Sequence, residues 1–427
     1  MQRDNYVQMF EEYDIHTPCY IFDEDELKDR VAGIQEALGA AGIGLCYAIK
    51  ANPFLVPAMD EIIDRYEVCS PGELEICRKA KIDGKKIIFS GVVKSYEDIR
   101  AALEYPVDVI TVESLRHWQL LKECIADTGR SASVLLRLTS GAQFGMREDE
   151  IRLVLKEIQT LSQIDFAGIH YFAGTQRKSG KYEKELPGLA VFMKALQADF
   201  GLENMVLEYG PGLMVPYFEG GEEEDFPKDI CALAGYIKEQ DFPFQVTVEL
   251  GRYIAASCGR YVTRIVDLKQ VEDRNYCLVD GGIHQVSYYG QSMAMRKPYI
   301  CHVLQGRRTA GSLSCGHGDN EQEKAGSEDR QNEDRQKEYM VCGSLCTFAD
   351  ILVRGLLLSD PQIGDFLVFE RIGAYSVTET GYLFLSRDFP AIYSYGRNRG
   401  LCTLRRKRVS WEINVADQDS AAGTVPE

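Results

Sequence analysis

The sequence has no Cys-x-x-Cys pair, no apolar run long enough to cross a bilayer, and fewer basic than acidic residues. Its 48 Lys and Arg face 65 Asp and Glu, which gives a formal net charge of −17. Such a surface repels nucleic-acid phosphates and anionic lipid, so we expect neither nucleic-acid nor membrane partners. The N-terminal stretch MQRDNYVQMFEEYD lacks the apolar segment that a secretory signal requires.

The 13 cysteines are odd in number and scattered along the chain. Several lie within apolar runs, such as Cys46, Cys69 and Cys77. This distribution is typical of reduced, buried thiols rather than of disulfides or zinc ligands. We therefore expect a cytoplasmic protein that binds no metal.

A length of 427 residues is too great for one ordinary domain. Within residues 25–255, apolar runs alternate with helix-period segments. The runs that predict buried strands are 45–49, 66–70, 86–91, 108–113, 133–139, 166–173, 205–210 and 244–251. Apolar strands separated by amphipathic helices indicate a parallel sheet covered by helices, and about eight such units match a (β/α)₈ TIM barrel. A doubly wound open sheet is the alternative, but no GxGxxG motif follows the first strand.

After residue 255 the chain is rich in β-type runs with turn residues between them, and helical periodicity is sparse. We predict a mainly antiparallel β domain over residues 256–411. The run PCYIFD at 18–23 predicts that residues 1–24 join this domain. The expected fold class is therefore α/β, a TIM barrel followed by an antiparallel β domain.

Two segments are predicted to lack fixed structure. Residues 311–338 contain almost no apolar side chains and cannot bury enough surface to offset the entropy cost of ordering. Residues 412–427 are expected to form a flexible tail. We assign no chemistry to either segment.

Active residues of a TIM barrel lie at the carboxyl ends of its strands, and several polar residues and glycines fall there. Lys50 ends the first strand run, CYAIK. The others lie in or just after later strand runs and are Glu67, Ser70, Glu73, Arg137, His170, Gly210, Gly212, Glu249, Gly251 and Arg252. Any one of them alone is more often a salt-bridge or turn residue, but together they indicate a site.

The chemistry of this set points to pyridoxal 5′-phosphate. A lysine that leaves an apolar strand can lose its proton through desolvation and attack an aldehyde. The turn Gly-Pro-Gly at 210–212 lets backbone amides approach a phosphate. A carboxylate at a strand end can keep a pyridine nitrogen protonated. An aldolase-type barrel also uses a strand lysine but needs no partner for a ring nitrogen.

Nine segments resemble, in order, those of the fold-type III pyridoxal-phosphate-dependent decarboxylases, the family of the diaminopimelate and ornithine/arginine decarboxylases, to which alanine racemase is more distantly related. They are YAIKANP, SPGELE, FSGVVKS, GIHYFAGTQ, EYGPG, ELGR, VDGG, CGSLCTFAD and GDFLVFERIGAY. The resemblance spans about residues 18–400 and implies decarboxylation of an amino acid. It implies that Lys50 binds the cofactor aldehyde and that Glu249 pairs with the ring nitrogen.

The resemblance also implies roles for other residues. Those implied to hold the cofactor are Lys50, Glu67, Arg137, His170, Gly210, Gly212, Glu249, Gly251, Arg252 and Tyr375. Those implied to contact the substrate are Arg252, Thr347, Asp350 and Tyr375. Cys346 matches the catalytic cysteine, which the partner subunit presents to protonate the carbanion. A homodimer with shared active sites is therefore expected.

Some positions depart from the family pattern. Thr347 stands where diaminopimelate and ornithine enzymes carry an acidic residue for the distal ammonium of the substrate. Phe172 replaces the second histidine of HxHIGSQ, which stacks on the cofactor. These features resemble the natural-product branch that acts on amino acids tethered to a carrier protein. The expected substrate is thus a small free amino acid or an aminoacyl carrier protein.

Two other functions are considered. A pyridoxal-phosphate-dependent racemase would need a base on each face of the substrate, and the motif around Cys346 argues instead for decarboxylation. A non-catalytic homologue would bind the cofactor without turnover, but the presence of Lys50, Glu249 and Cys346 together speaks against it. His284, Gln285, Tyr288 and Tyr289 are candidates without an assigned role.

Overall fold

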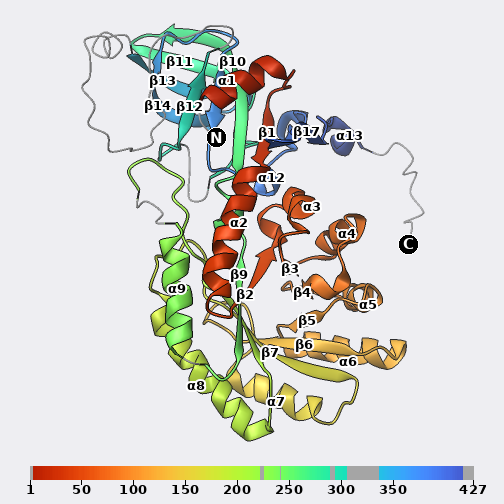
Figure 1. The fold of residues 1–427 in the computed structure, drawn as a ribbon. Coiled ribbons are helices and arrows are strands. Elements are labelled where there is room, and N and C mark those ends of the chain that lie inside the picture. The colour runs from red at the N-terminus through yellow and green to blue at the C-terminus, as the bar shows by residue number, and fades with distance from the viewer. Residues whose placement is uncertain (1–2, 222–225, 241, 289–293, 305–335, 417–427) are drawn as a thin grey trace. The chain divides into compact units, whose positions relative to one another are not determined.

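The structure is a computed structural model that describes residues 3–221, 226–240, 242–288, 294–304 and 336–416 (Figure 1). The chain divides into two compact units. The barrel unit comprises Asp25–Pro216 and Glu222–Ser257, and the β unit comprises Met1–Glu24, Tyr217–Gly221 and Cys258–Glu427.

The barrel unit is built on a closed barrel of eight parallel strands. They are β2 (Gly44–Ala48), β3 (Arg65–Val68), β4 (Ile87–Phe89), β5 (Val109–Val112), β6 (Ala132–Arg137), β7 (Ile164–Phe172), β8 (Val206–Gly210) and β9 (Gln245–Leu250). The barrel closes where β2 pairs with β9, with Cys46 opposite Glu249. The predicted TIM barrel and its eight strand runs are confirmed.

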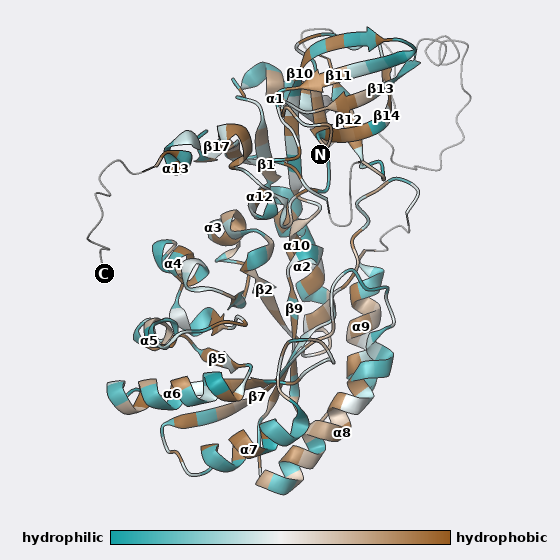
Figure 2. Cartoon of the chain, turned by 180° about the vertical axis from the view of Figure 1, so that it is seen from behind, coloured by the Kyte–Doolittle hydropathy of each residue, from teal (hydrophilic) through white to brown (hydrophobic). Residues whose placement is uncertain are grey.

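Helices and 3₁₀ turns connect the strands. They are α2 (Glu24–Gly39), η1 (Ile49–Ala51), η2 (Pro53–Leu55), α3 (Val56–Met59), α4 (Pro71–Lys79), η3 (Gly84–Lys86), α5 (Tyr96–Glu104), α6 (Leu115–Thr128), α7 (Glu148–Ile158), α8 (Tyr182–Phe200), α9 (Lys228–Glu239) and α10 (Arg252–Ala255). In α7 the buried side chains recur at helical spacing, at Ile151, Val154, Leu155 and Ile158. Figure 2 shows both hydrophilic and hydrophobic residues along these helices. None of the described helices is long and apolar enough to span a bilayer.

A bulge in β7 helps to set which residues reach the carboxyl end of the barrel. The register between β6 and β7 shifts after Val134, which leaves Ala167 as an extra residue. Gly168 has φ +151°, and a Cβ there would lie 1.9 Å from the carbonyl oxygen of Val206. Only glycine fits this close approach of two strands. Beyond the bulge, His170 lies opposite Arg137 of β6.

The β unit contains a second sheet. Its strands are β1 (Cys19–Asp23), β10 (Gly259–Val271), β11 (Arg274–Val279), β12 (Ile300–Val303), β13 (Gln336–Cys342), β14 (Ile351–Ser359), β15 (Phe366–Phe369), β16 (Ala391–Gly396) and β17 (Gly400–Arg405). Within the described residues, every pairing is antiparallel except β1–β16 and β11–β13. The predicted mainly antiparallel character is therefore confirmed.

The N-terminal segment is part of this unit. β1 pairs with β10 and β16, so the run at 18–23 lies inside the sheet. Helix α1 (Arg3–Glu12) precedes it, and its Tyr6 and Met9 pack in a core with Ile21 and Val368. The unit also contains α12 (Ser376–Glu379), η4 (Phe384–Ser386) and α13 (Trp411–Asn414).

Two segments expected to lack structure are ordered at one end. Residues 336–338 begin β13 and pair with 357–359 of β14, because exposed Lys337 and Glu338 can face water while the backbone is paired. Residues 412–414 belong to α13, where Asn414 Nδ2 donates to the carbonyl oxygen of Leu383 at 2.8 Å. Expecting disorder there was wrong, since composition does not reveal backbone pairing. Residues 311–335 and 417–427 lie outside the described residues.

Candidate active site

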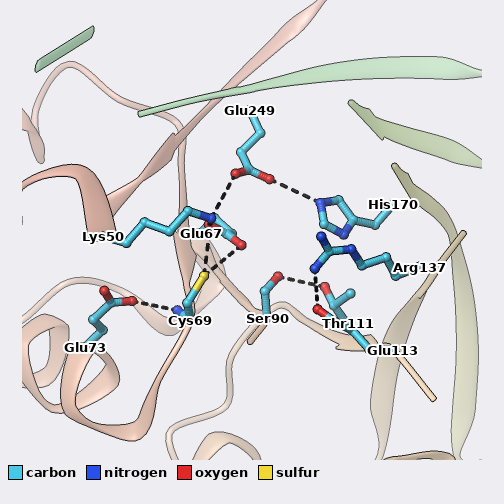
Figure 3. A network of polar contacts seen from close by, with 10 residues as sticks. All are labelled: Lys50, Glu67, Cys69, Glu73, Ser90, Thr111, Glu113, Arg137, His170 and Glu249. Carbon is cyan, nitrogen blue, oxygen red and sulfur yellow. Dashed lines mark hydrogen bonds and ion pairs between the residues drawn. The ribbon is translucent and has the colours of Figure 1, made fainter. Parts of the chain in front are cut away.

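Lys50 lies in turn η1, directly after β2, and its amine is at the centre of a polar cluster (Figure 3). Its Nζ donates to Glu67 Oε2 at 2.7 Å and to Glu249 Oε1 at 3.4 Å. The Lys50 side chain is 34% exposed, whereas both carboxylates are 3% exposed. The carboxyl end of the barrel therefore presents one accessible amine with two buried counter-charges.

Glu249 connects Lys50 to His170. Its Oε1 faces the Lys50 amine, and its Oε2 lies 3.2 Å from His170 Nε2. Burial by itself would raise the pKa of Glu249. The Lys50 ammonium, the His170 imidazole and the Arg137 guanidinium together hold that pKa well below its usual value. Glu249 is thus an ionised carboxylate inside the barrel.

His170 and Arg137 are buried at the ends of neighbouring strands. His170 is 2% exposed, and its Nδ1 has no hydrogen-bond partner within the described residues. Arg137 Nη1 donates to Glu113 Oε1 at 2.5 Å. The Phe172 ring lies 6.0 Å from the Arg137 guanidinium carbon and 5.8 Å from Lys50 Nζ. The structure thus places an aromatic ring near two basic side chains, at the position where the sequence resemblance leads one to expect a histidine.

Cys69 is a member of the cluster that the motif analysis did not single out. Its Sγ donates to Glu67 Oε1 at 3.0 Å and lies 3.5 Å from Lys50 Nζ. Burial raises the pKa of the Cys69 thiol well above its usual value, so it stays protonated. Its two-residue spacing from Glu67 along a strand was the signal that both side chains share one face.

Glu73 and Ser70 stabilise the turn after β3 through hydrogen bonds to its backbone. Glu73 Oε2 accepts from the backbone N–H of Cys69 at 2.7 Å, and Ser70 Oγ accepts from the N–H of Glu73 at 3.1 Å. Ser70 is thereby the N-cap of α4. The structure gives these two predicted residues backbone partners rather than contacts with the Lys50 amine.

Lys94 is a second buried amine. It is 5% exposed, and its Nζ donates to the carbonyl oxygen of Gly91. Burial lowers the pKa of Lys94 to about 8, although nearby Glu113 raises it. The sequence analysis did not predict Lys94 as a site residue. Its segment, FSGVVKS, contributes to the family resemblance, but no local pattern indicates that the lysine side chain is buried.

The predicted glycines lie where backbones come close. Gly212 has φ +64°, and a Cβ there would lie 1.8 Å from the carbonyl oxygen of Gly174. A Cβ at Gly210 would lie 2.5 Å from the Phe172 ring. The backbone N–H of Arg177 donates to the carbonyl of Gly212 at 2.8 Å, which joins the loops after β7 and β8. Gly251 precedes α10, and Arg252 begins it.

Glu208 is a buried acid that the sequence analysis missed. It lies on β8 in register with His170 and is 1% exposed. Burial, and the charge of Glu249, raise the pKa of Glu208 to about 8. Two acids on neighbouring strands therefore differ in protonation at neutral pH, with Glu208 neutral and Glu249 charged.

The remaining predicted residues belong to the β unit. Cys346 and Thr347 are exposed in the loop between β13 and β14, and Tyr375 precedes α12 with φ +67°. Asp350, expected to contact substrate, is 2% exposed and accepts from the backbone N–H groups of Ile283 at 2.8 Å and Leu345 at 2.7 Å. Its carboxylate stabilises the loop. No group of His, Cys, Asp and Glu with the arrangement of a metal site occurs in the part of the chain that the structure describes.

Comparison with known proteins gives one family. A family model described as "Pyridoxal-dependent decarboxylase, pyridoxal binding domain" matches residues 24–256. The L-glutamyl-[BtrI acyl-carrier protein] decarboxylase of Niallia circulans is 26% identical over 94% of each chain. The diaminopimelate decarboxylase of Campylobacter jejuni is 25% identical over 96% of this chain and 98% of that one. The structure of diaminopimelate decarboxylase from Helicobacter pylori complexed with L-lysine has the same fold, with a TM-score of 0.79 at 21% identity over 96% of this chain and 99% of that chain.

The raised pKa of Glu208 predicts a pH-dependent stability. Its pKa is about 8 in the folded chain against an ordinary value of 4.5, so folding takes up a proton between these pH values and stability falls as pH rises. Glu208→Gln cannot titrate. We expect its free energy of unfolding, relative to wild type, to increase by up to about 1.4 kcal/mol per pH unit over this range. Urea unfolding at several pH values measures this difference. The control is Glu239→Gln, at an exposed position, whose free energy of unfolding relative to wild type should not change with pH. If the difference for Glu208→Gln is also independent of pH, the raised pKa of Glu208 is contradicted.

Proposed function

This chain belongs to the family of pyridoxal-dependent decarboxylases, and we propose how its residues carry out the reaction. The activity is pyridoxal 5′-phosphate-dependent removal of a carboxyl group from an amino acid. The racemase alternative loses support because the matched family and these relatives are decarboxylases. The observation that carries the assignment of roles is the Lys50 amine, held between the buried carboxylates of Glu67 and Glu249.

The residues present fit pyridoxal phosphate. An accessible amine beside the carboxyl groups of Glu67 and Glu249 suits an aldehyde, and a buried carboxylate with a lowered pKa suits a protonated pyridine nitrogen. Backbone loops whose glycines leave no room for a Cβ suit a phosphate group. We assign the aldehyde to Lys50, the ring nitrogen to Glu249, and the phosphate to the turns that contain Gly210, Gly212 and Gly251.

Lys50 and Glu249 have the central roles. When bound, the cofactor accepts the electron pair that carbon dioxide leaves on the α-carbon of the substrate. Glu249 keeps its charge because Lys50, His170 and Arg137 hold its pKa low, and burial strengthens the attraction of this charge for a protonated ring nitrogen. His170 holds the second oxygen of that carboxylate and so fixes its orientation. Glu67 gives the Lys50 amine a hydrogen-bond acceptor at 2.7 Å.

We assign proton donation at the α-carbon to the exposed thiol of Cys346, and contact with the substrate to Arg252, Thr347 and Tyr375. Arg137 is paired with Glu113 and lies near the Phe172 ring, so we assign it to the wall of the cofactor site. Asp350 fixes the loop that carries Cys346.

A homodimer with shared active sites is proposed from the same loop. Phe348 lies two residues after Cys346 and is 99% exposed. A fully exposed phenyl ring leaves apolar area in water, which a partner subunit would cover. We therefore propose that this loop completes the site of the partner.

We also propose a tethered substrate. Thr347 has no charge to hold a distal ammonium, which a free diamino acid would present. An amino acid bound to a carrier through its distal carboxyl would not need one. The relative from Niallia circulans, whose name describes such a substrate, supports this proposal.

A reducing cytoplasmic location is proposed because the described cysteines are all free thiols.

Glu249→Gln keeps the size of the side chain but removes its charge. We expect it to lower kcat for carbon dioxide release by roughly 100-fold or more, because the ring nitrogen loses its ionised partner. Lys50→Ala should lose the visible absorption of the covalently held cofactor. Exposed Glu75→Gln is the control and should retain wild-type kcat. Wild-type turnover in Glu249→Gln would contradict the assignment.

Mixing two inactive variants tests the shared active site. Lys50→Ala and Cys346→Ala have defects in different units of the chain, so a mixed dimer would contain one intact site. We expect activity to return after the two variants are dissociated and reassociated together. Lys50→Ala mixed with Glu249→Gln is the control, since both defects lie in one barrel. Failure to regain activity, with mixed dimers present by mass spectrometry, would contradict a shared site.

Substrate choice separates tethered from free amino acids. We expect carbon dioxide release from the L-glutamyl thioester of pantetheine and little from meso-diaminopimelate. Thr347→Glu should shift the ratio of kcat/KM toward diaminopimelate by at least about tenfold, because it restores a charge for the distal ammonium. Efficient turnover of diaminopimelate by wild type would refute tethering while leaving decarboxylation intact.

A further inference from the structure

The β unit contains a separate polar cavity of about 220 Å³. Residues from Pro18, the turn after β11, the segment before β16 and the segment after β17 line it. Its lining includes the polar side chains of Asp280, His284, Gln285, Arg387, Asp388 and Lys407. All of these residues belong to the β unit, and none is among the residues assigned above to the cofactor or the substrate.

Most charged groups of this cavity already have partners. Asp280 accepts hydrogen bonds from Thr17 Oγ1 at 2.6 Å, Thr263 Oγ1 at 2.6 Å and the N–H of Arg264 at 2.9 Å. Asp388 Oδ2 lies 3.1 Å from Lys407 Nζ. Gln285 Oε1 accepts from Tyr261 at 2.9 Å, and its Nε2 donates to the carbonyl of Asp388 at 2.8 Å. These contacts leave Arg387 and His284 for a ligand.

Arg387 is the cation of the cavity that is not neutralised. Its side chain is exposed, and its Nη2 donates to the carbonyl oxygen of Ser344 at 2.8 Å. Within the described residues it forms no ion pair with a carboxylate. The guanidinium is therefore held at one end by the backbone and available to an anion.

His284 is the second group without a full set of partners. It is 3% exposed, and its Nδ1 has no hydrogen-bond partner in the described part of the chain. Burial, and the nearby charge of Arg387, lower the pKa of His284 to about 4, so the imidazole is neutral. His284 also lines the cavity, so its neutral imidazole can donate a hydrogen bond to a carboxylate held by Arg387.

Hydrogen bonds join the cavity wall to the loop that carries Cys346. Arg387 donates to the carbonyl of Ser344, and the N–H of Ser344 donates to the carbonyl of Gly281 at 2.7 Å. Asp350 accepts from Ile283, next to His284, and from Leu345, next to Cys346. A ligand that changes the Arg387–Ser344 contact would therefore act on the backbone two residues before Cys346.

We propose that this cavity binds a small carboxylate through Arg387 and His284. Binding changes the conformation of the loop that carries Cys346. The planar guanidinium fits a carboxylate through two parallel hydrogen bonds. The carboxylates of Asp280 and Asp388 lie in the same wall and disfavour a doubly charged phosphate. The chemistry thus favours a singly charged organic acid.

Propionate and its neutral isostere propionamide test the proposal on the holoenzyme. Saturation-transfer NMR titration should show propionate binding and no binding of propionamide. Arg387→Gln should weaken propionate binding by roughly tenfold or more, since it removes a charge-assisted hydrogen bond. Arg387→Lys keeps the charge and should retain part of the affinity. The matched control Arg406→Gln removes an exposed arginine that does not line the cavity and should bind as wild type.

The effect on the loop is measured by alkylation of Cys346 with iodoacetamide, followed by peptide mass spectrometry. We expect saturating propionate to change the alkylation rate at least twofold in wild type and Arg406→Gln, and to leave it unchanged in Arg387→Gln. Propionate binding that survives Arg387→Gln would assign the ligand to another site and overturn the proposal. Tighter binding of inorganic phosphate would overturn the carboxylate assignment, and binding without a change in alkylation would overturn the coupling.

Discussion

The ionised carboxylate of Glu249 is the feature on which the rest of the candidate active site depends. A carboxylate buried in a barrel would normally take up a proton, because burial favours the neutral form. Lys50 on one side and His170 on the other keep it charged (Figure 3). The amine of Lys50 and the imidazole of His170 thus act together on Glu249 and lower the pKa of its carboxyl.

The neighbouring strand shows the opposite outcome for the same functional group. Glu208 on β8 and Glu249 on β9 are both buried, yet burial and the charge of Glu249 raise the pKa of Glu208 to about 8. The difference comes from Lys50 and His170, whose side chains lie against Glu249. Two buried acids on adjacent strands can therefore differ in protonation, because the side chains of Lys50 and His170 lie against only one of them.

Residue types at strand ends were predictable, whereas several of their roles were not. Asp350 matches a family motif, yet both of its carboxylate oxygens accept backbone N–H groups and stabilise a loop. Cys69 lies in a predicted strand run and Lys94 in the segment FSGVVKS, but only the folded chain turns Cys69 toward Lys50 and buries Lys94. A motif gives the type and order of residues, and hydrogen bonding depends on neighbours that lie far along the chain.

The alternation of apolar runs with helix-period segments determined the barrel, because strands buried on both faces and helices buried on one leave different periodicities. It also determined that Lys50 and Glu249 lie at strand ends. Only the tertiary structure decided that these two side chains meet. They are separated by about two hundred positions and come together because β2 pairs with β9 when the barrel closes. That closure depends on the register of every strand between them, which no local pattern of residues specifies.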